Sequence, residues 1–384
     1  MLMIHGGNIL LYGILFILII DGIWWLFIKE DITRTWLKIV YWLVTTTFVL
    51  SLIVYNILAS QIDHSTLFYS ISGYAGLVVI WYLPKLLYIT IRLIALPISL
   101  IGERCAKAIK SISLILATIL FAACIYGFTA GRYAYKVNEF EIPIKNITSD
   151  LIGVKIAHIS DLHLGSFPTD YKGIDIMVEE INKHNVDLVL ITGDMVNGIA
   201  EEMVPYIPVL KQIKSRYGVY SILGDHDNGI YISKFTDTER FANRRRLIEY
   251  QKEAGIELLS NESVNIPIGR DTLYLIGVDL ESTPDFNPVM GKPVILMVYD
   301  PSYWRGQVLN QSADLTLSGK THAMQMGFKI GNIEWSPAQY LYNEYDGLHQ
   351  MNGYYLNVSR GIGYIGIPGR VGLRPVIDII TLKK

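Results

Sequence analysis

Cysteine is nearly absent from the sequence, and its scarcity narrows the possible chemistry. The 384 residues contain two cysteines, Cys105 and Cys124, and both lie in the first third of the chain. The remaining two thirds can therefore form neither a disulfide framework nor a zinc site built from thiolates.

Charged residues are also scarce. Asp, Glu, Lys and Arg together make up 18% of the sequence, and the formal net charge is −2. A protein that binds nucleic acid normally presents a basic surface, and this sequence has no basic excess from which to build one. We therefore expect no nucleic-acid partner.

Hydrophobic residues make up 51% of the chain, and they form long runs near the N-terminus. The runs cover residues 9–28 and 36–59, a third begins near Phe68, and a fourth covers 112–128. Each approaches the roughly 20 apolar residues that a helix needs to cross the hydrocarbon core of a lipid bilayer. We predict a membrane domain over 1–131 with about four transmembrane helices, then a linker over 132–149.

The third run is irregular, because it passes through Pro84 and Lys85 and then Arg92 before a further proline at Pro97. A proline inside a helix removes a backbone hydrogen bond and bends the helix. We expect a kinked helix that leaves the bilayer here or lies along its surface, and we do not count residues 84–101 as a separate span. A fifth span at this place would reverse the predicted topology.

Lysine and arginine in short loops mark the cytoplasmic side of a membrane protein. Such residues follow the first and third predicted spans: Lys29, Arg34, Lys38, Lys85, Arg92, Arg104, Lys107 and Lys110. Four spans then place both ends of the chain outside the cytoplasm. We expect an integral protein of an inner or plasma membrane with an extracytoplasmic C-terminal domain, although Arg132 and Lys136 count weakly against this orientation.

Asp21 lies inside the first predicted span. A charged residue at such a place is often functional, but it can also lie near an interface or bond to the threonines at 45–47 of the second span. We favour the structural interpretation, because no second charged residue in the predicted spans suggests a relay.

From Asn138 onward the composition is that of a globular domain. Short β-type runs at 154–159, 187–191 and 219–223 each end in polar residues, and residues 174–185 between the first two have helical spacing. Further strands are expected at 272–278, 294–298, 315–318, 354–359 and 376–382. We predict an α/β sandwich of mixed sheets flanked by helices, with functional side chains at the carboxyl ends of the strands.

Carboxylates and imidazoles follow several of these strands: Asp161, His163, Asp194, Asp225, His226 and His322. Taken singly, each residue is more often a helix cap or a turn former. Together at neighbouring strand ends they indicate a divalent metal site suited to Mn, Fe, Zn or Mg.

Four strings in this order resemble the motifs of the calcineurin-like metallophosphoesterases: residues 160–165 (SDLHLG), 192–194 (TGD), 224–227 (GDHD) and 319–322 (GKTH). The membrane-anchored bacterial branch is the most similar, and the resemblance covers 150–384. It implies a first metal held by Asp161, His163 and His322, with Asp194 as a bridging ligand. It also implies that His226 assists at the phosphoester.

The second metal site departs from the family pattern. Asp225 stands where the family has Asn, Tyr299 and Lys320 stand where it has histidines, and Asn197 replaces a common Asp. A protonated lysine has no lone pair and repels a nearby cation, so Lys320 cannot be a ligand. We expect Lys320 to replace the second ion and to pair with Asp225, and Tyr299 to donate to Asp225 or to a phosphate oxygen. One ion is then expected, although two remain an alternative, with Asp225 as a further ligand.

Three functions remain open. The first is hydrolysis of a phosphomonoester or phosphodiester by one ion, with His226, Lys320 and Tyr299 as catalytic residues. The second is a pseudoenzyme that binds a phosphorylated ligand or a protein without turnover. In the third, the membrane domain carries the function and the outer domain only regulates it. A lipid head group is the substrate that the tether near the bilayer favours. Aromatic residues after the metal motif, such as Trp335 and Tyr340, could form a lipid-facing platform, but core packing explains most of them more simply.

Overall fold

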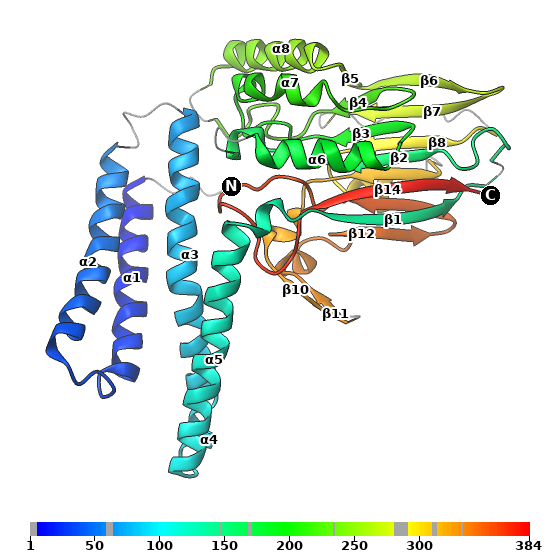
Figure 1. Ribbon diagram of the computed structural model, residues 1–384. Helices are drawn as coiled ribbons and strands as arrows, with labels where there is room; N and C mark the ends of the chain where they lie inside the picture. Colours follow the sequence, from blue (N-terminus) through cyan, green and yellow to red (C-terminus); the bar gives the residue numbers. More distant parts are fainter. Residues whose placement is uncertain are drawn as a thin grey trace. The chain divides into compact units, whose positions relative to one another are not determined.

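The computed structural model describes residues 6–58, 64–145, 147–167, 171–232, 235–279, 291–308, 313–331 and 333–384. The chain divides into two compact units, Met1–Ile125 and Tyr126–Lys384. Figure 1 shows long helices in the first unit and sheets with flanking helices in the second.

The first unit is helical: α1 (Gly6–Ile28), α2 (Thr35–Leu58), α3 (His64–Ile94), α4 (Leu96–Ser99) and most of α5 (Glu103–Phe128). Among the described residues, four helices are long and apolar enough to cross a membrane, over Leu10–Ile28, Thr35–Ile57, Ser70–Ile94 and Glu103–Phe128. Four predicted spans are thus confirmed by length and composition. The third differs from the prediction, because α3 runs through Pro84 and keeps Lys85 and Arg92 inside the helix.

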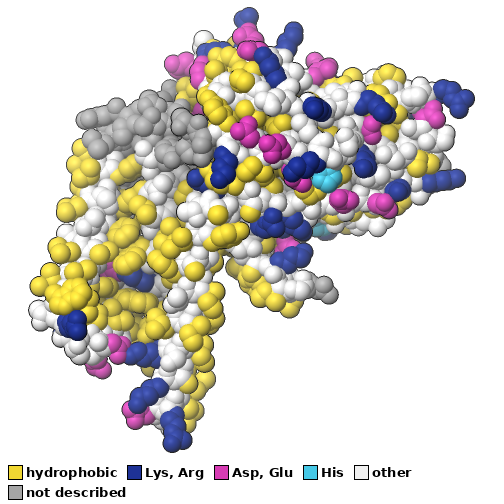
Figure 2. All heavy atoms as spheres, viewed as in Figure 1, with side chains coloured by type: hydrophobic (Ala, Val, Ile, Leu, Met, Phe, Trp, Pro, Cys, Tyr) yellow, Lys and Arg dark blue, Asp and Glu magenta, His cyan; other side chains and the backbone are white. Residues whose placement is uncertain are grey.

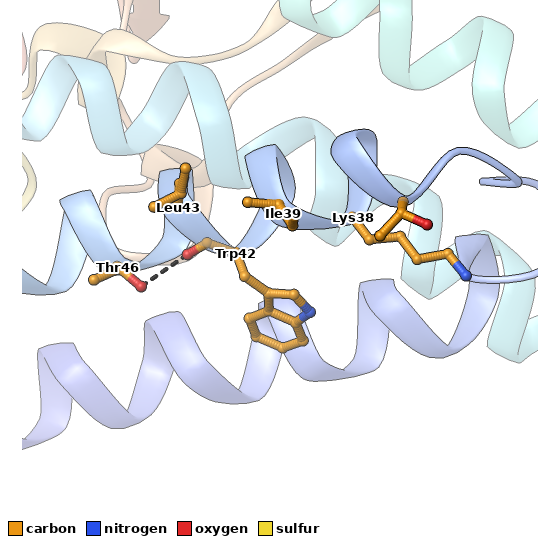
Figure 3. Close-up of a pocket in the computed structure, with 6 residues that line it drawn as sticks. Lys38, Ile39, Trp42, Leu43 and Thr46 are labelled. Carbon is orange, nitrogen blue, oxygen red and sulfur yellow. Dashed lines mark hydrogen bonds between the residues drawn. The ribbon is translucent and has the colours of Figure 1, made fainter.

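Side chains on the outer surface of α2 show how the first unit suits a lipid environment. A shallow hollow of about 350 Å³ is lined by Thr35, Lys38, Ile39, Trp42, Leu43 and Thr46 (Figure 3). Most of its exposed surface is apolar, although two threonines and a lysine contribute to it. The hydroxyl of Thr46 donates to the carbonyl of Trp42 at 2.8 Å. This bond to the preceding turn leaves the hydroxyl satisfied without water.

Charged residues meet inside the first unit. The carboxylate of Asp21, which is fully buried, bonds Thr45 Oγ1 at 2.6 Å and Tyr82 OH at 3.0 Å. The bond from Thr45 was expected, but the prediction that Asp21 has no charged partner in the spans was wrong. Lys85 Nζ lies 2.5 Å from Asp21 Oδ1, and its side chain is 8% exposed. The sequence placed Lys85 at the cytoplasmic side because the third span was expected to kink at Pro84 and leave the bilayer there.

The described residues of the second unit form two six-stranded sheets and a separate hairpin of β10 (Phe328–Ile330) and β11 (Ile333–Trp335). The first sheet has the order β1 (Lys136–Pro143), β14 (Val376–Lys383), β2 (Lys155–Ile159), β3 (Leu188–Thr192), β4 (Val219–Ile222) and β5 (Ile256–Leu258). The second has the order β12 (Gly347–Met351), β13 (Tyr354–Val358), β9 (Leu315–Ser318), β8 (Val294–Val298), β7 (Asp271–Val278) and β6 (Glu262–Ile268).

The core of this unit lies on both faces of the first sheet. In β3, Leu188 and Leu190 pack toward the second sheet, whereas Val189 and Ile191 pack toward the helices. The helical layer consists of α6 (Lys172–Lys183), α7 (Ile207–Leu210) and α8 (Asp237–Glu253) (Figure 1). Burial on both faces explains why this strand is apolar throughout. The predicted α/β sandwich is confirmed.

The segment expected to be a linker differs from the prediction. Within 132–149, β1 pairs in parallel with β14 from Lys136↔Val376 to Pro143↔Lys383. Asn138 Nδ2 also donates to Asp378 Oδ1 at 2.8 Å. Residues 136–143 are therefore the edge strand of the first sheet, and the globular fold begins soon after α5.

Candidate metal centre

Strand order brings the polar residues of the predicted site together. β2, β3 and β4 are adjacent and parallel, so the loops that follow them, with Asp161, Asp194 and Asp225, meet at one edge. β9 of the second sheet leads into Lys320 and His322. This is the carboxyl edge at which ligands bind in open α/β sheets.

The backbone at these loops is unusual. Asp161, His163, Asp194, Lys320 and His322 all have positive φ, between 45° and 77°. Left-handed backbone is rare for residues other than glycine and collects at functional sites, where the surrounding fold holds it in place. Here it turns consecutive polar side chains toward the same point.

Asp161, His163 and His322 form the centre of the cluster. Their ligand atoms all lie within 4.8 Å of one another, and all three side chains are buried. The two Nε2 atoms of the histidines are 3.1 Å apart, and His322 Nε2 lies 3.3 Å from Asp161 Oδ1. Asp194 Oδ2 is 3.6 Å from His163 Nε2. The structure thus brings together the four residues expected to hold the first metal.

The donor set fits a divalent ion. Two carboxylates and two imidazoles are suitable ligands for Mn, Fe or Zn. His163 Nδ1 lies 3.0 Å from Asn197 Oδ1, an amide oxygen that can only accept. That bond puts the ring proton on Nδ1 and leaves the Nε2 lone pair facing the cluster, as metal-binding histidines require.

Lys320 is held beside this cluster by two carboxylates. Its Nζ lies 2.8 Å from Asp225 Oδ2, as predicted, and 3.1 Å from Asp300 Oδ2, which the sequence analysis did not single out. Burial alone would lower the pKa of Lys320, but the ion pairs with Asp225 and Asp300 outweigh it and raise the pKa. The lysine is a fixed cation.

Tyr299 makes different contacts from those expected. Its hydroxyl donates to Asp194 Oδ2, and it lies 3.4 Å from Asp161 Oδ1. Of the two expected partners, Asp225 does not receive this bond, because the single hydroxyl proton goes to Asp194, and a phosphate oxygen stays a prediction. Tyr299 instead links the two carboxylates that face the metal position.

His226 borders the cluster through its backbone and its ring. Its backbone N–H donates to Asp194 Oδ1 at 2.9 Å, and its Nδ1 donates to the carbonyl of Asn197 at 2.8 Å. The ring meets that of His163 edge to face at 5.0 Å. Burial lowers the pKa of His226 to about 4, so the imidazole is neutral at physiological pH.

Two further residues support the loops without having been assigned a role. Asp227 is fully buried and accepts the backbone N–H groups of Val196 at 3.1 Å and Gly224 at 3.0 Å. Arg370, also buried, donates to the carbonyl of His322 at 2.8 Å. Asp227 lies in the GDHD string at 224–227, but a string of residues does not show what a buried charge supports.

Comparison with known proteins agrees with this geometry. Residues 7–132 match a family described as the transmembrane domain of a probable calcineurin-like phosphoesterase, and residues 154–324 match the calcineurin-like phosphoesterase family. An uncharacterized metallophosphoesterase of Helicobacter pylori is 29% identical over 64% of this chain and 63% of its own length.

Two other relatives are similar over a comparable stretch. A transmembrane protein with a metallophosphoesterase domain from Danio rerio is 30% identical over 70% of this chain and 62% of its own length. The uncharacterized metallophosphoesterase YkoQ of Bacillus subtilis is 27% identical over 70% of this chain and 97% of its own length. The chain thus spans less than two thirds of the length of the Helicobacter pylori and Danio rerio relatives.

Proposed function

The chain belongs to the calcineurin-like metallophosphoesterases that carry a transmembrane domain, and on that premise we propose that it hydrolyses a phosphomonoester or phosphodiester beside a membrane. The reaction uses one divalent ion, held by Asp161, His163, Asp194 and His322. Lys320 takes the place of a second ion. The observation that carries this proposal is the fixed ammonium of Lys320 next to a cluster of metal-ligating side chains.

The residues of the site suit attack on a phosphoester. A bound divalent ion supplies Lewis acidity toward a phosphoryl oxygen. An ammonium has three N–H donors, and the bonds to Asp225 and Asp300 use two of them, so Lys320 keeps one donor for a phosphoryl oxygen. A positioned cation of this kind stabilises the charge that develops during phosphoryl transfer.

His226 and Tyr299 have supporting roles in the proposal. The bond from His226 Nδ1 to the Asn197 carbonyl fixes its neutral tautomer with the lone pair on Nε2. The ring can thus orient a hydroxyl or water at the phosphoester by accepting its proton in a hydrogen bond. Tyr299 donates its one hydroxyl proton to Asp194 Oδ2 and so offsets part of the repulsion between Asp194 and the nearby Asp161.

A lipid head group is the substrate class that we favour. The last candidate span ends at Phe128 and β1 begins at Lys136, so the site is carried on a short tether from the bilayer. An orientation outside the cytoplasm is part of the same proposal. Lys110 of α5 pairs with Asp31 of the α1–α2 loop. This contact puts the basic residues that follow the first span and those that precede the last span on the same side of the membrane domain, as a cytoplasmic face requires.

The test uses the full chain purified in detergent. We expect about one divalent ion per chain by elemental analysis and hydrolysis of bis-p-nitrophenyl phosphate, with both lost in His322→Ala. A chain that holds no ion after careful preparation contradicts the metal site. A chain that holds its ion but hydrolyses neither this compound nor p-nitrophenyl phosphate is a binding module instead.

A further inference from the structure

The β10–β11 hairpin has an apolar face that the globular fold covers only in part, because Trp335 is half-buried and the other three side chains are exposed. β10 (Phe328–Ile330) and β11 (Ile333–Trp335) form a two-stranded sheet of their own. Phe328 pairs with Trp335, Lys329 with Glu334, and Ile330 with Ile333. Because side chains alternate along a strand and paired residues share a face, the four apolar side chains lie on one face.

The exposure of this face is large. Ile330 is 71% exposed, Ile333 67% and Phe328 43%. The rings of Phe328 and Trp335 stack at 5.6 Å between centroids, so the aromatic end of the face is ordered. The space-filling view shows hydrophobic side chains over this hairpin (Figure 2). An isolated hairpin that presents apolar side chains to water is marginally stable.

The polar face of the hairpin is the one that meets the rest of the fold. Glu334 bonds Lys329 Nζ at 2.7 Å and Arg360 Nη2 at 2.5 Å, and Arg360 also pairs with Asp346. The side chains of Arg360 and Asp346 are 8% and 13% exposed. Glu334 is thus tied to a buried ion-pair network while Ile330 and Ile333 on the other face are exposed. A surface element in water normally buries its apolar face instead.

Covalent structure limits what can cover the apolar face. α5 is a candidate membrane span that ends at Phe128, and the fold continues with β1 from Lys136. At about 3.5 Å per residue, this connection reaches at most on the order of 30 Å, so the second unit stays beside the bilayer. Four side chains are also far fewer than the 20–30 residues per side of a stable protein interface.

We propose that the apolar face of the β10–β11 hairpin, formed by Phe328, Ile330, Ile333 and Trp335, is a membrane-contact surface that inserts into the headgroup region of the bilayer. Stacked aromatic rings are well suited to that region. The contact bears on the metal centre, because Ser336 Oγ, directly after the hairpin, donates at 2.6 Å to the carbonyl of Ala323, the residue after His322. The proposal does not depend on hydrolysis.

The test places a fluorescent probe on each side of the hairpin. The full chain, with Cys105→Ser and Cys124→Ser, receives one new cysteine at a time: Ile333→Cys or Ile330→Cys on the apolar face, Lys329→Cys on the opposite face, or Phe241→Cys on α8, which is 71% exposed. Each protein is labelled with nitrobenzoxadiazole and reconstituted in vesicles of phosphatidylcholine with some phosphatidylglycerol. Doxyl-labelled phosphatidylcholine serves as the quencher.

We expect blue-shifted emission and strong quenching by doxyl lipid at positions 330 and 333, weaker quenching at 329, and a water-like, unquenched probe at 241. Probes at 330 and 333 that behave like the probe at 241 overturn the proposal. A shielded probe that doxyl lipid does not quench also overturns it, because a second copy or another segment then covers the face.

Discussion

Lys320 Nζ lies 3.1 Å from Asp300 Oδ2, and this contact completes a clamp in which the ammonium is shared between two carboxylates. The second carboxylate matters because a single ion pair would let the flexible lysine swing away. Two partners on opposite loops fix the charge at one point. A fixed charge costs less reorganisation during a reaction than a mobile one.

Replacing Lys320 by methionine tests this charge directly. Lys320→Met keeps most of the side-chain volume but removes the donor, and we expect hydrolysis of bis-p-nitrophenyl phosphate to fall roughly 10²-fold or more. The metal content should stay at about one ion, since Lys320 is not a ligand. Lys211→Met, at a half-exposed lysine near α8, is the matched control. Full activity in Lys320→Met would mean that Lys320 only fills the position of the second ion and takes no part in hydrolysis.

A second substitution tests whether Lys320 and Tyr299 replace an ion. Tyr299→His together with Lys320→His supplies the two imidazoles that the family pattern has at these positions, while Asp194 and Asp225 remain. We expect the metal content to rise from about one ion per chain toward two, measured by elemental analysis after dialysis. A content that stays at one shows that the loops no longer have the geometry of a second site.

The first half of the site was predictable because its signals are local. Asp161 and Asp194 each lie two residues after a short apolar strand, and the carboxyl ends of these neighbouring parallel strands meet. His322 lies four residues after β9. The resemblance to the calcineurin-like metallophosphoesterases then indicated which of these residues hold the metal. Placing His322 beside Asp161 and Asp194 depends on how the two sheets pack, because β9 belongs to the second sheet.

The remainder depends on pairings between distant positions. Asp300 follows β8 and Lys320 follows β9, and only the folded sheet shows that they touch. Lys85 is 64 positions from Asp21, and its place in a continuous helix is hidden by Pro84. β1 was missed for the same reason, because its partner β14 lies at the other end of the chain.

The ion pair inside the membrane domain predicts a non-additive pair of substitutions. Asp21→Asn alone leaves the Lys85 charge buried, and Lys85→Met alone leaves the Asp21 charge buried, so each should cost about 3–5 kcal/mol of stability. The double substitution removes both charges and should cost less than either single one. Thermal unfolding in detergent measures the stability of the unchanged chain, the two single variants and the double variant. Thr45→Val is a control that removes one hydrogen bond. Additive costs would show that the pair does not interact.

Glu202 predicts a pH dependence of stability. Its Oε2 accepts the backbone N–H of Asn197 at 2.5 Å, and burial raises its pKa from 4.5 to about 7. A carboxyl group with a raised pKa favours the folded state when protonated, so its contribution is full below pH 4.5 and is lost as the pH rises through 7. Glu202→Gln mimics the protonated group.

We therefore expect Glu202→Gln to gain stability over the unchanged chain as the pH rises from 4.5 to 8, by on the order of 3 kcal/mol at the upper end. Thermal unfolding across this range measures the difference. Glu257→Gln, on the exposed side of β5, is the control and should show no such trend. A constant difference between the two chains would mean that Glu202 keeps an ordinary pKa.

A methyl group added at Gly127, near the end of α5, is expected to disturb the metal centre. A Cβ on Gly127 would lie 1.9 Å from the carbonyl oxygen of Arg370, whose backbone N–H lies 3.3 Å from the carbonyl of Gly127. Gly127→Ala must therefore push the backbone at Arg370 away. We expect this shift to break the hydrogen bond from Arg370 to the carbonyl of His322. We expect a loss of about 1–3 kcal/mol in stability, as overpacking usually costs, and weaker retention of metal during dialysis. Gly73→Ala in α3, where a Cβ meets nothing within 4 Å, is the matched control and should be neutral or slightly stabilising. If Gly127→Ala unfolds and holds metal like Gly73→Ala, the close approach of these two backbones does not position His322.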